Sequence, residues 1–325
     1  MRVLCKILAL VALAVSSAVA TAQSTYPERT IRIVVPFPPG GDIDPIARAL
    51  AAHFQATWGQ SAIVENKPGS AAIIGTDYVA KSAPDGHTLL LSGVGPLVIH
   101  PSLYPKLPYS VERDLQPISL IADTPMVMVI NQTVPAKNLD EFLAFAKSKA
   151  GGVSYASAGT GSIPHLTAVL FAAAAGIQMT HVPYKGTAPA INDLLGGHVN
   201  MYFNPLPSAR GYLKGNPDKV RPLAVTSSRR SRELPDVPTL DELGLKGFNV
   251  KSWYGLIAPA GTPKETVQKL NAELKRAISD SAFSARLIAL GTDPSWSTVE
   301  QFAEQIKQES VMWEKIIREH GIKVD

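Results

Sequence analysis

One twenty-residue stretch, residues 31–50 with the sequence IRIVVPFPPGGDIDPIARAL, restricts the fold more than any other part of the chain. Its first five residues are mostly β-branched, which predicts a strand buried on both faces of a parallel sheet. The prolines and glycines of PFPPGG end that strand, and the glycines let another molecule approach the bare main chain. Asp44 followed by Pro45 predicts a helix with Asp44 as its N-cap. The helix N-terminus therefore points to the carboxyl end of a sheet, where open α/β proteins bind their ligands.

A second stretch follows the same plan with different residues. Residues 153–157 predict a strand, Gly159-Thr160-Gly161 a flexible turn, and Ser162 the start of a helix. This N-cap is neutral and the first turn has no carboxylate, so the N–H groups and partial positive charge of the helix end remain available to an anion. His165 and Lys185 are candidate additional donors, although either residue alone is more often an ordinary packed or solvated side chain.

Other segments of the chain alternate between strand and helix patterns, as expected of an α/β protein. A single proline-rich segment, residues 100–117, is expected to be a long covering loop. The Asp123-Thr124-Pro125 segment is expected to separate two short strands at the first crossing between domains. Further strands are predicted at residues 61–65, 87–92, 118–121, 126–130, 179–183, 199–203, 221–226 and 252–259.

Residues 1–22 have the pattern of a secretory signal peptide. Two basic residues precede an apolar run at 7–15, and small residues follow, which predicts cleavage after Ala20 or Ala22. A membrane anchor is less favoured because a bilayer span needs about 20 apolar residues. The one cysteine, Cys5, lies in this leader. The mature chain therefore has no thiol, which excludes a disulfide framework, a cysteine nucleophile and a cysteine-ligated metal.

Length and charge exclude several classes of protein. The chain has 325 residues, of which 46% are apolar and 18% charged, so it is globular and long enough for two domains. Its net charge of +4 becomes nearly neutral when Arg2 and Lys6 of the leader are removed. Basic residues cluster only at Arg229, Arg230 and Arg232, and such a short loop indicates neither a nucleic-acid footprint nor a membrane-binding patch.

Catalytic motifs are missing from the sequence. It contains no G-x-S-x-G elbow, P-loop or H-E-x-x-H, and the GTGSIP segment at 159–164 lacks the third glycine of a dinucleotide fingerprint. The seven histidines show no metal-ligand spacing, so neither a metal nor a cofactor is expected. An exported hydrolase or transferase acting on a carboxylate stays open as an alternative function.

Short motifs spread along the chain resemble those of the Bug-type, TctC-like solute receptors of tripartite tricarboxylate transporters. The resemblance spans the mature chain in order, and its motifs are specific together although each alone is weak. They are Tyr26-Pro27, the PFPPGG core within 31–44, VENKPG at 64–69, APDG at 83–86, HVPYKG at 181–186, LAVT at 223–226, LPDVPT at 234–239 and APAGTP at 258–263.

This resemblance implies a fold and a function. The fold is the α/β type II periplasmic binding protein fold, in which two α/β domains joined by two crossing strands surround a central cleft. Domain 1 is expected at residues 26–122 and 227–325, and domain 2 at 123–226. The protein is expected to capture a small mono-, di- or tricarboxylate, aromatic acids included, in the periplasm and deliver it to integral-membrane permease subunits. It is expected to be a monomer, to bind no nucleic acid and to be no enzyme. A ligand-sensing subunit for a membrane kinase would use the same pocket.

The resemblance also implies which residues line the pocket. The first loop approaches the ligand partly through water, and the turn before the helix at Ser162 holds a carboxylate. Asn204 stands where many relatives have Asp, and a neutral amide should tolerate an additional anionic group better. Asp42 lies in a variable part of the first loop. The expected ligand-binding residues are Phe37, Pro39, Gly40, Gly41, Asp44, Gly93, Gly159, Thr160, Gly161, Ser162, His165, Tyr184, Lys185, Gly186, Thr187 and Asn204.

Overall fold

The computed structural model describes residues 26–324, so the predicted leader and its cleavage site lie outside the described residues. One mixed sheet runs through the molecule in the order β2-β1-β3-β9-β4-β7-β5-β6, and β8 and β10 pair with β4. The strands are β1 (Ile31–Val35), β2 (Ala62–Asn66), β3 (Thr88–Gly93), β4 (Leu115–Asn131), β5 (Val153–Ser157), β6 (Met179–Pro183), β7 (Met201–Pro205), β8 (Val220–Val225), β9 (Lys251–Pro259) and β10 (Asp293–Pro294).

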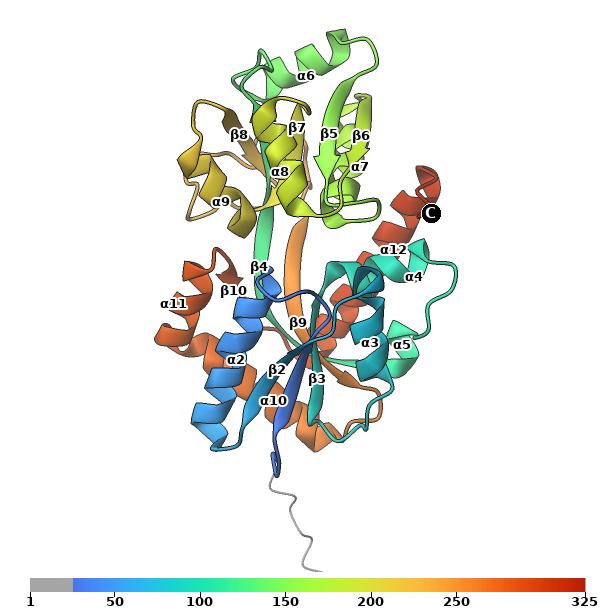
Figure 1. Ribbon diagram of the computed structural model, residues 1–325, viewed down its shortest axis with the longest axis vertical. Coiled ribbons are helices and arrows are strands. Elements are labelled where there is room, and N and C mark those ends of the chain that lie inside the picture. The colour runs from blue at the N-terminus through green and yellow to red at the C-terminus, as the bar shows by residue number, and fades with distance from the viewer. Residues whose placement is uncertain (1–25, 325) are drawn as a thin grey trace, which may run out of the picture.

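Helices cover both faces of this sheet (Figure 1). None of those in residues 26–324 is long and apolar enough to cross a bilayer. The α-helices are α2 (Ile43–Trp58), α3 (Ile73–Ala80), α4 (His100–Leu103), α5 (Val111–Asp114), α6 (Leu139–Ser148), α7 (Ile163–Ala175), α8 (Thr187–Gly196), α9 (Leu206–Gly215), α10 (Lys264–Ser279), α11 (Ser281–Ala289) and α12 (Val299–Glu319), and the short turns are the 3₁₀ helix η1 (Ser70–Ala72) and the π-helix η2 (Gly95–Ile99).

The molecule has two lobes connected by β4 and β9 (Figure 1). In the lower lobe β1 pairs in parallel with β2 and β3. In the upper lobe β5 pairs in parallel with β6 and β7. The two connecting strands are antiparallel to each other and pair from Leu115 to Pro125. This arrangement is the α/β fold of a periplasmic binding protein, as the sequence predicts.

Strand register brings the ligand-binding edges of the two lobes face to face. The last residue of β3, Gly93, pairs with Tyr254 of β9, which in turn pairs with Ala122 of β4. The last residue of β7, Pro205, pairs with Met126 of β4. The carboxyl ends of both parallel strand sets therefore reach the middle of β4 from opposite directions, within about four residues, or roughly 13 Å, of each other.

Two predictions about the connecting region are wrong. β4 is one continuous strand and not two, because Pro125 falls where β4 changes partner from β9 to β7 and β8, so its missing N–H lies at the end of a ladder. The segment 100–117 is not a plain loop, since α4 and α5 lie within it. Ser110 starts α5 by accepting a hydrogen bond from the backbone N–H of Arg113.

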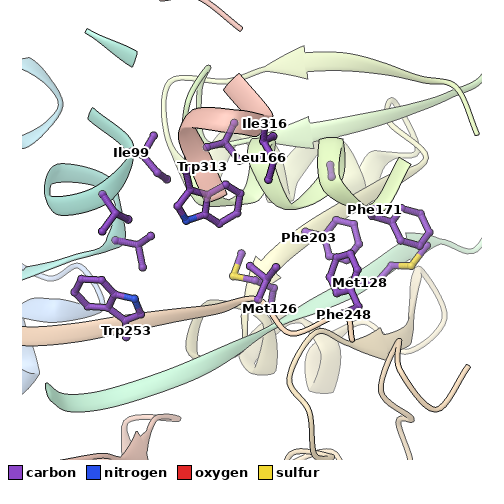
Figure 2. Packing of buried hydrophobic residues seen from close by; sticks show 14 of the residues in the cluster. Ile99, Met126, Met128, Leu166, Phe171, Phe203, Phe248, Trp253, Trp313 and Ile316 are labelled. Carbon is purple, nitrogen blue, oxygen red and sulfur yellow. The ribbon is translucent and has the colours of Figure 1, made fainter. Parts of the chain in front are cut away.

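Buried apolar side chains also join the lobes. Figure 2 shows Trp313 and Ile316 of α12 beside Leu166 of α7, in the same cluster as Phe203 and Met128 of the upper lobe. These side chains are almost fully buried, and burying each such side chain stabilises the fold by about 1.5–3 kcal/mol. The last helix therefore ties the two lobes together on one side of the molecule.

The segment that follows β8 lies against the upper lobe. Val225 forms a parallel bridge with Thr239, and the N–H of Leu240 donates to the carbonyl of Val225 at 2.9 Å. The N–H of Val250 donates to the carbonyl of Thr226 at 3.0 Å. These contacts keep residues 227–250 beside β8, whereas the predicted boundary assigns them to domain 1. The division into domains stays a prediction.

Candidate ligand-binding site

The PFPPGG loop leaves β1 at the edge of the lower lobe and leads into α2. The helix begins at Ile43 with Asp42 as its N-cap, so the prediction of Asp44 as N-cap is wrong by two residues. The backbone is already helical at Asp42, with φ −56° and ψ −34°, and the N–H of Asp44 donates to the carbonyl of Gly41 at 3.2 Å. Pro45 accordingly lies inside the first turn, where its missing N–H costs little.

The side chain of Asp44 stabilises this loop through hydrogen bonds. Its carboxylate is buried and accepts hydrogen bonds from Arg48 Nε at 2.9 Å, from Asn66 Nδ2 at 2.9 Å and from the N–H of Gly40 at 3.4 Å. Burial alone would raise the pKa of Asp44, but these hydrogen bonds outweigh it and hold the pKa below its ordinary value. Gly40 needs the flexibility of glycine, since its φ is +82°.

Other predicted residues of the lower lobe differ in exposure. Pro39, Gly40 and Gly41 are exposed at the tip of the loop, and Phe37 is half-buried against the lower core. Gly93 is buried, and a Cβ there would lie 2.8 Å from the carbonyl oxygen of Trp253. Gly93 is therefore explained by the close approach of β9.

Three helices of the upper lobe begin at one edge of the sheet. Helices α7, α8 and α9 follow the parallel strands β5, β6 and β7, with Ser162, Gly186 and Pro205 as N-caps. None of these N-caps makes a side-chain capping hydrogen bond, and none of the three first turns contains an acidic residue. The partial positive charges of the three helix ends are thus not neutralised by their own side chains, in contrast to α2 with Asp44.

The predicted turn before α7 is held by its own hydrogen bonds. Gly159 and Gly161 have φ values of +127° and +77°, and Thr160 between them is exposed. The hydroxyl of Ser162 donates to the carbonyl of Gly159 at 2.6 Å. The N–H of Gly161 donates to His165 Nδ1 at 3.0 Å, so that donor is not free for a ligand. The helix starts where predicted, but the Ser162 side chain braces the turn and does not cap the helix.

A stack of aromatic rings lies beneath this turn. The rings of His165 and His181 stack with centroids 3.9 Å apart, and Tyr155 stacks with His181 at 5.0 Å. Because His165 Nδ1 accepts from Gly161, the proton of neutral His165 is on Nε2. Burial, with the neighbouring His181 as the second cause, lowers the pKa of His165 to about 3, and burial lowers that of His181 to about 4. Both rings are neutral near pH 7.

Ser157 and His181 form a contact that resembles a nucleophile beside a base. Ser157 Oγ lies 2.7 Å from His181 Nε2, but Ser157 is fully buried and its Oγ also bonds to the carbonyl and the N–H of Gly159 at 3.1 Å. Within residues 26–324 no carboxylate bonds to His181, and its lowered pKa makes it a poor base. The contact holds the glycine turn in place.

The remaining predicted residues differ in whether their polar groups are free to bind a ligand. The Tyr184 hydroxyl donates to Asp193 Oδ2 at 2.6 Å, and Lys185 is exposed. Gly186 has a φ of +112° and leads into α8 at Thr187. Asn204, at the end of β7, is fully buried, and its Oδ1 has no hydrogen-bond partner among residues 26–324. An unpartnered buried amide oxygen at this edge is compatible with a polar ligand.

Sequence reasoning missed the residues that join the lobes at this edge. Both carboxylate oxygens of Asp42 accept from the hydroxyl of Ser208 in α9, at 3.1 and 3.2 Å. The buried hydroxyl-bearing residues Tyr202 and Tyr254 lie close enough for the charge of Asp42 to raise their pKa values, although burial is the larger cause. Asp42 and Ser208 are 166 residues apart in sequence, so no local pattern connects them.

Two cavities in the described part of the chain lie elsewhere. One, of about 320 Å³, borders α9 and β8 next to Arg210 and Arg221. The other, of about 190 Å³, borders the loop of Arg229, Arg230 and Arg232. Neither cavity is lined by a residue that the sequence predicts to bind ligand.

In this molecule the carboxyl ends of two sets of parallel strands, one in each lobe, face each other across two connecting strands. This arrangement defines the class of two-lobed periplasmic solute-binding proteins. The chain belongs to the tripartite tricarboxylate transporter family receptors, whose family model matches residues 46–322.

Solved structures agree with this assignment. The chain is similar to the periplasmic binding protein BugD, with 38% identity, a TM-score of 0.77 and coverage of 92% of this chain and 99% of that one. It is similar to Rhodopseudomonas palustris Rpa4515 with adipate, with 31% identity, a TM-score of 0.82 and coverage of 92% and 99%. It is also similar to MatC from Rhodopseudomonas palustris with bound malate, with 34% identity, a TM-score of 0.76 and coverage of 90% and 100%.

Proposed function

We propose that this protein captures a small carboxylic acid between its two lobes and delivers it to integral-membrane permease subunits of a tripartite transporter. The observation that carries the proposal is the convergence of α7, α8 and α9 at one sheet edge with no acidic residue in any first turn. Helix N-termini with free partial charge are well suited to bind a carboxylate. This applies most to α7 and α8, because Asp42 of the lower lobe already approaches the start of α9 through Ser208. The lower lobe supplies the tip of the PFPPGG loop, where Pro39, Gly40 and Gly41 are exposed.

The chemistry of similar proteins supports the same ligand class. Structures that share about a third of this sequence contain adipate and malate, both dicarboxylates. In our proposal one carboxylate group lies at the start of α7, near Ser162, and is approached by the loop at Pro39 to Gly41. Asn204 and the start of α8 at Thr187 complete the pocket, while Asp44, Gly93 and the hydroxyl of Tyr184 support it without touching the ligand. The exposed Lys185 assists electrostatically.

Binding and release make up the whole function in this proposal, with no chemical step and no cofactor. The contact between Ser157 and His181 is a feature that would favour an enzyme, so we include it in the test. If it is structural, Ser157→Ala should keep ligand affinity within about threefold of wild type, and the purified protein should leave ester and amide derivatives of its ligand unchanged. If wild type hydrolyses such a derivative and Ser157→Ala does not, the protein is a hydrolase and not a receptor.

We further propose that the mature protein works in the periplasm as a monomer after cleavage of the leader at Ala20 or Ala22. Family members are periplasmic binding proteins, which supports this location. The contacts of residues 227–250 with β8 favour a domain 2 that extends to about residue 250. A role in signalling to a membrane kinase would use the same pocket, and growth of a deletion strain on the identified ligand would separate uptake from sensing.

A ligand screen tests the proposed function. Mono-, di- and tricarboxylates, aromatic acids included, are compared with sugars and amines by thermal shift and then by calorimetry. At least one carboxylate should stabilise the protein by about 2.7 kcal/mol when present at one hundred times its Kd. Stabilisation by sugars or amines alone would overturn the carboxylate assignment.

A further inference from the structure

The side-chain carboxylate of Asp42 lies where the two lobes meet, in the site that we propose binds a carboxylic acid. Asp42 is half-buried at the N-cap of α2, and its side chain reaches across to Ser208 in the first turn of α9. It forms no ion pair with any residue of the described chain. A negative charge at this position opposes the binding of a ligand that carries nothing but carboxylates.

The hydrogen bonding of Asp42 is incomplete. A carboxylate accepts up to about four hydrogen bonds, and a serine hydroxyl has only one proton to donate to both oxygens. Tyr202 and Tyr254 lie close to Asp42, but within residues 26–324 neither hydroxyl donates to its carboxylate, and Ser208 is the side chain that does. Burial raises the pKa of Asp42, and the hydrogen bond from Ser208 offsets only part of this. A charged acceptor that is short of donors is costly where water is partly excluded, as it is at the half-buried Asp42.

The missing donor can come from the ligand. Resting on the proposed function, we infer that Asp42 is a specificity-determining residue that selects carboxylic acids carrying a second polar group, a hydroxyl or an ammonium, which donates a hydrogen bond to its free carboxylate positions. The ligand's own carboxylate is then held by the helix ends of the upper lobe, and its hydroxyl or ammonium faces the lower lobe.

The cost of leaving Asp42 unpaired supports strong discrimination between acids with and without a hydrogen-bond donor. A site built to bond a ligand's donor rejects an analogue without it, because the site's buried polar group is then left unpaired. Asp42 adds repulsion to this penalty, since an unsubstituted carboxylate brings only negative charge close to it. We therefore expect at least tenfold tighter binding of a donor-bearing acid than of its unsubstituted parent.

Matched ligand sets test the inference on the full mature protein. Each set contains a parent acid, its hydroxy derivative and its amino derivative: succinate, malate and aspartate; glutarate, 2-hydroxyglutarate and glutamate; phenylacetate, mandelate and phenylglycine. Calorimetry is performed with wild type, Asp42→Asn and Asp218→Asn. Asp218 is the matched control because it is exposed beside the start of β8, and Val220 there pairs with Asn131 at the upper-lobe end of β4, away from the middle of β4 where the lobes meet.

Asp42→Asn keeps an oxygen that can accept from Ser208 or from a hydroxyl, but it loses the charge. If the ligand donor is an ammonium, Asp42→Asn should lower its affinity at least tenfold. If the donor is a hydroxyl, affinity should change less than about threefold, while the parent acid should bind several-fold more tightly because the repulsion is gone. Asp218→Asn should match wild type in both cases, and melting curves check that each variant is folded.

The outcomes separate this inference from the proposed function. Two results would overturn the role of Asp42 and leave a carboxylate receptor. In the first, wild type binds a parent acid as tightly as its hydroxy and amino derivatives, or more tightly. In the second, Asp42→Asn has the wild-type affinities for all three members of a set. Failure of every carboxylate, in these sets and in the wider screen, would instead remove the proposed function itself.

Discussion

The imidazole rings of His165 and His181 lie nearly parallel, with centroids 3.9 Å apart and planes 6° apart. Two protonated rings at this distance would repel each other, and both are removed from water to a large extent. The stack is therefore stable only when neutral. It fixes the turn before α7, since His165 accepts from Gly161 and His181 bonds to Ser157.

We predict that protein stability falls as the pH drops below about 6.5. An unfolded histidine has a pKa near 6.5, whereas burial lowers the folded values to about 3 for His165 and about 4 for His181 and His100. Between these values the unfolded chain binds more protons, so unfolding becomes easier by up to about 1.4 kcal/mol per pH unit for each histidine. Urea unfolding from pH 7.5 to 4.5 measures the slope.

A variant assigns part of this slope to the stack. His181→Phe keeps a flat ring but cannot be protonated, so its stability should depend less steeply on pH than that of wild type. His198→Gln is the control, because His198 is exposed. A slope in His181→Phe that equals the wild-type slope would show that the stack does not titrate on unfolding.

Asp44→Ala should destabilise the protein by about 1–3 kcal/mol, because it removes the acceptor of the Gly40 N–H and one of the two acceptors of the Asn66 amide group, which keeps only the carbonyl of Phe37. The pKa of Asp44 is lowered in the fold, so its contribution is present above the unfolded pKa near 4 and is lost as pH falls through the folded value. Chemical unfolding at pH 7 and pH 3 measures both effects. Glu319→Ala, which removes an exposed partner of Lys315, should change stability by less than about 0.5 kcal/mol.

Gly161→Ala should destabilise the protein more than Gly40→Ala, although both glycines have positive φ, +77° and +82°. Both variants incur the strain of a left-handed residue, about 1–2 kcal/mol. A Cβ at Gly161 would in addition collide with the buried side chain of Leu103 in α4, whereas a Cβ at Gly40 meets no atom within 4 Å. Thermal melting compares the two, and equal losses would argue against close packing between this turn and α4.

Ser162→Glu should fold and lose ligand affinity. A carboxylate in the first turn is favoured by the helix end by roughly 0.3–1 kcal/mol, partly offset by loss of the hydrogen bond from Ser162 to Gly159. The new charge repels the ligand from the N–H groups of α7, so affinity should fall at least tenfold, or about 1.4 kcal/mol. Calorimetry with the screened carboxylate measures this.

Ser162→Ala is the matched control, since it removes the same hydroxyl without adding charge, and it should bind much more tightly than Ser162→Glu. Lys185→Ala should weaken binding less than Ser162→Glu does, because Lys185 is exposed and only assists. Wild-type affinity in a folded Ser162→Glu protein would remove this turn from the binding site.

Ligand binding should make the protein more compact. The lobes touch through Asp42 and Ser208 and through Arg210, whose Nη2 donates to the carbonyl of Ala289 at 2.8 Å. A ligand held by both lobes favours the arrangement in which they are close. Small-angle scattering should therefore show a smaller radius of gyration at saturating ligand, and an unchanged profile would count against closure.

The sequence determined the local elements and the class of protein. Runs of β-branched residues such as those at 31–35, ended by glycine and proline, form strands, and the helix at Ser162 starts where the neutral N-cap predicted. Such signals work because strand and helix preferences depend on neighbours a few residues away. The motifs spread along the chain likewise sufficed to predict the family, which the matching family model confirms.

Only the tertiary structure decided how β4 passes Pro125 and where α2 begins. A proline in the sequence predicts the end of a strand, but β4 continues through Pro125 because its partner strands change at that residue. The local pattern predicts Asp44 as an N-cap, but its carboxylate accepts hydrogen bonds from Arg48 and Asn66 instead, and Asn66 lies outside the helix, at the end of β2.

The contacts between the lobes were beyond prediction for the same reason. Ser208 and Asp42 meet because β7 and β3 both end level with the middle of β4, and β1, which leads to Asp42, pairs with β3. That register depends on strand pairing over the whole chain. The sequence therefore specified which loops carry glycines and helix starts. The fold decided which of their groups are free to bind and which are already bonded to each other, since hydrogen-bond partners are set by distance in space.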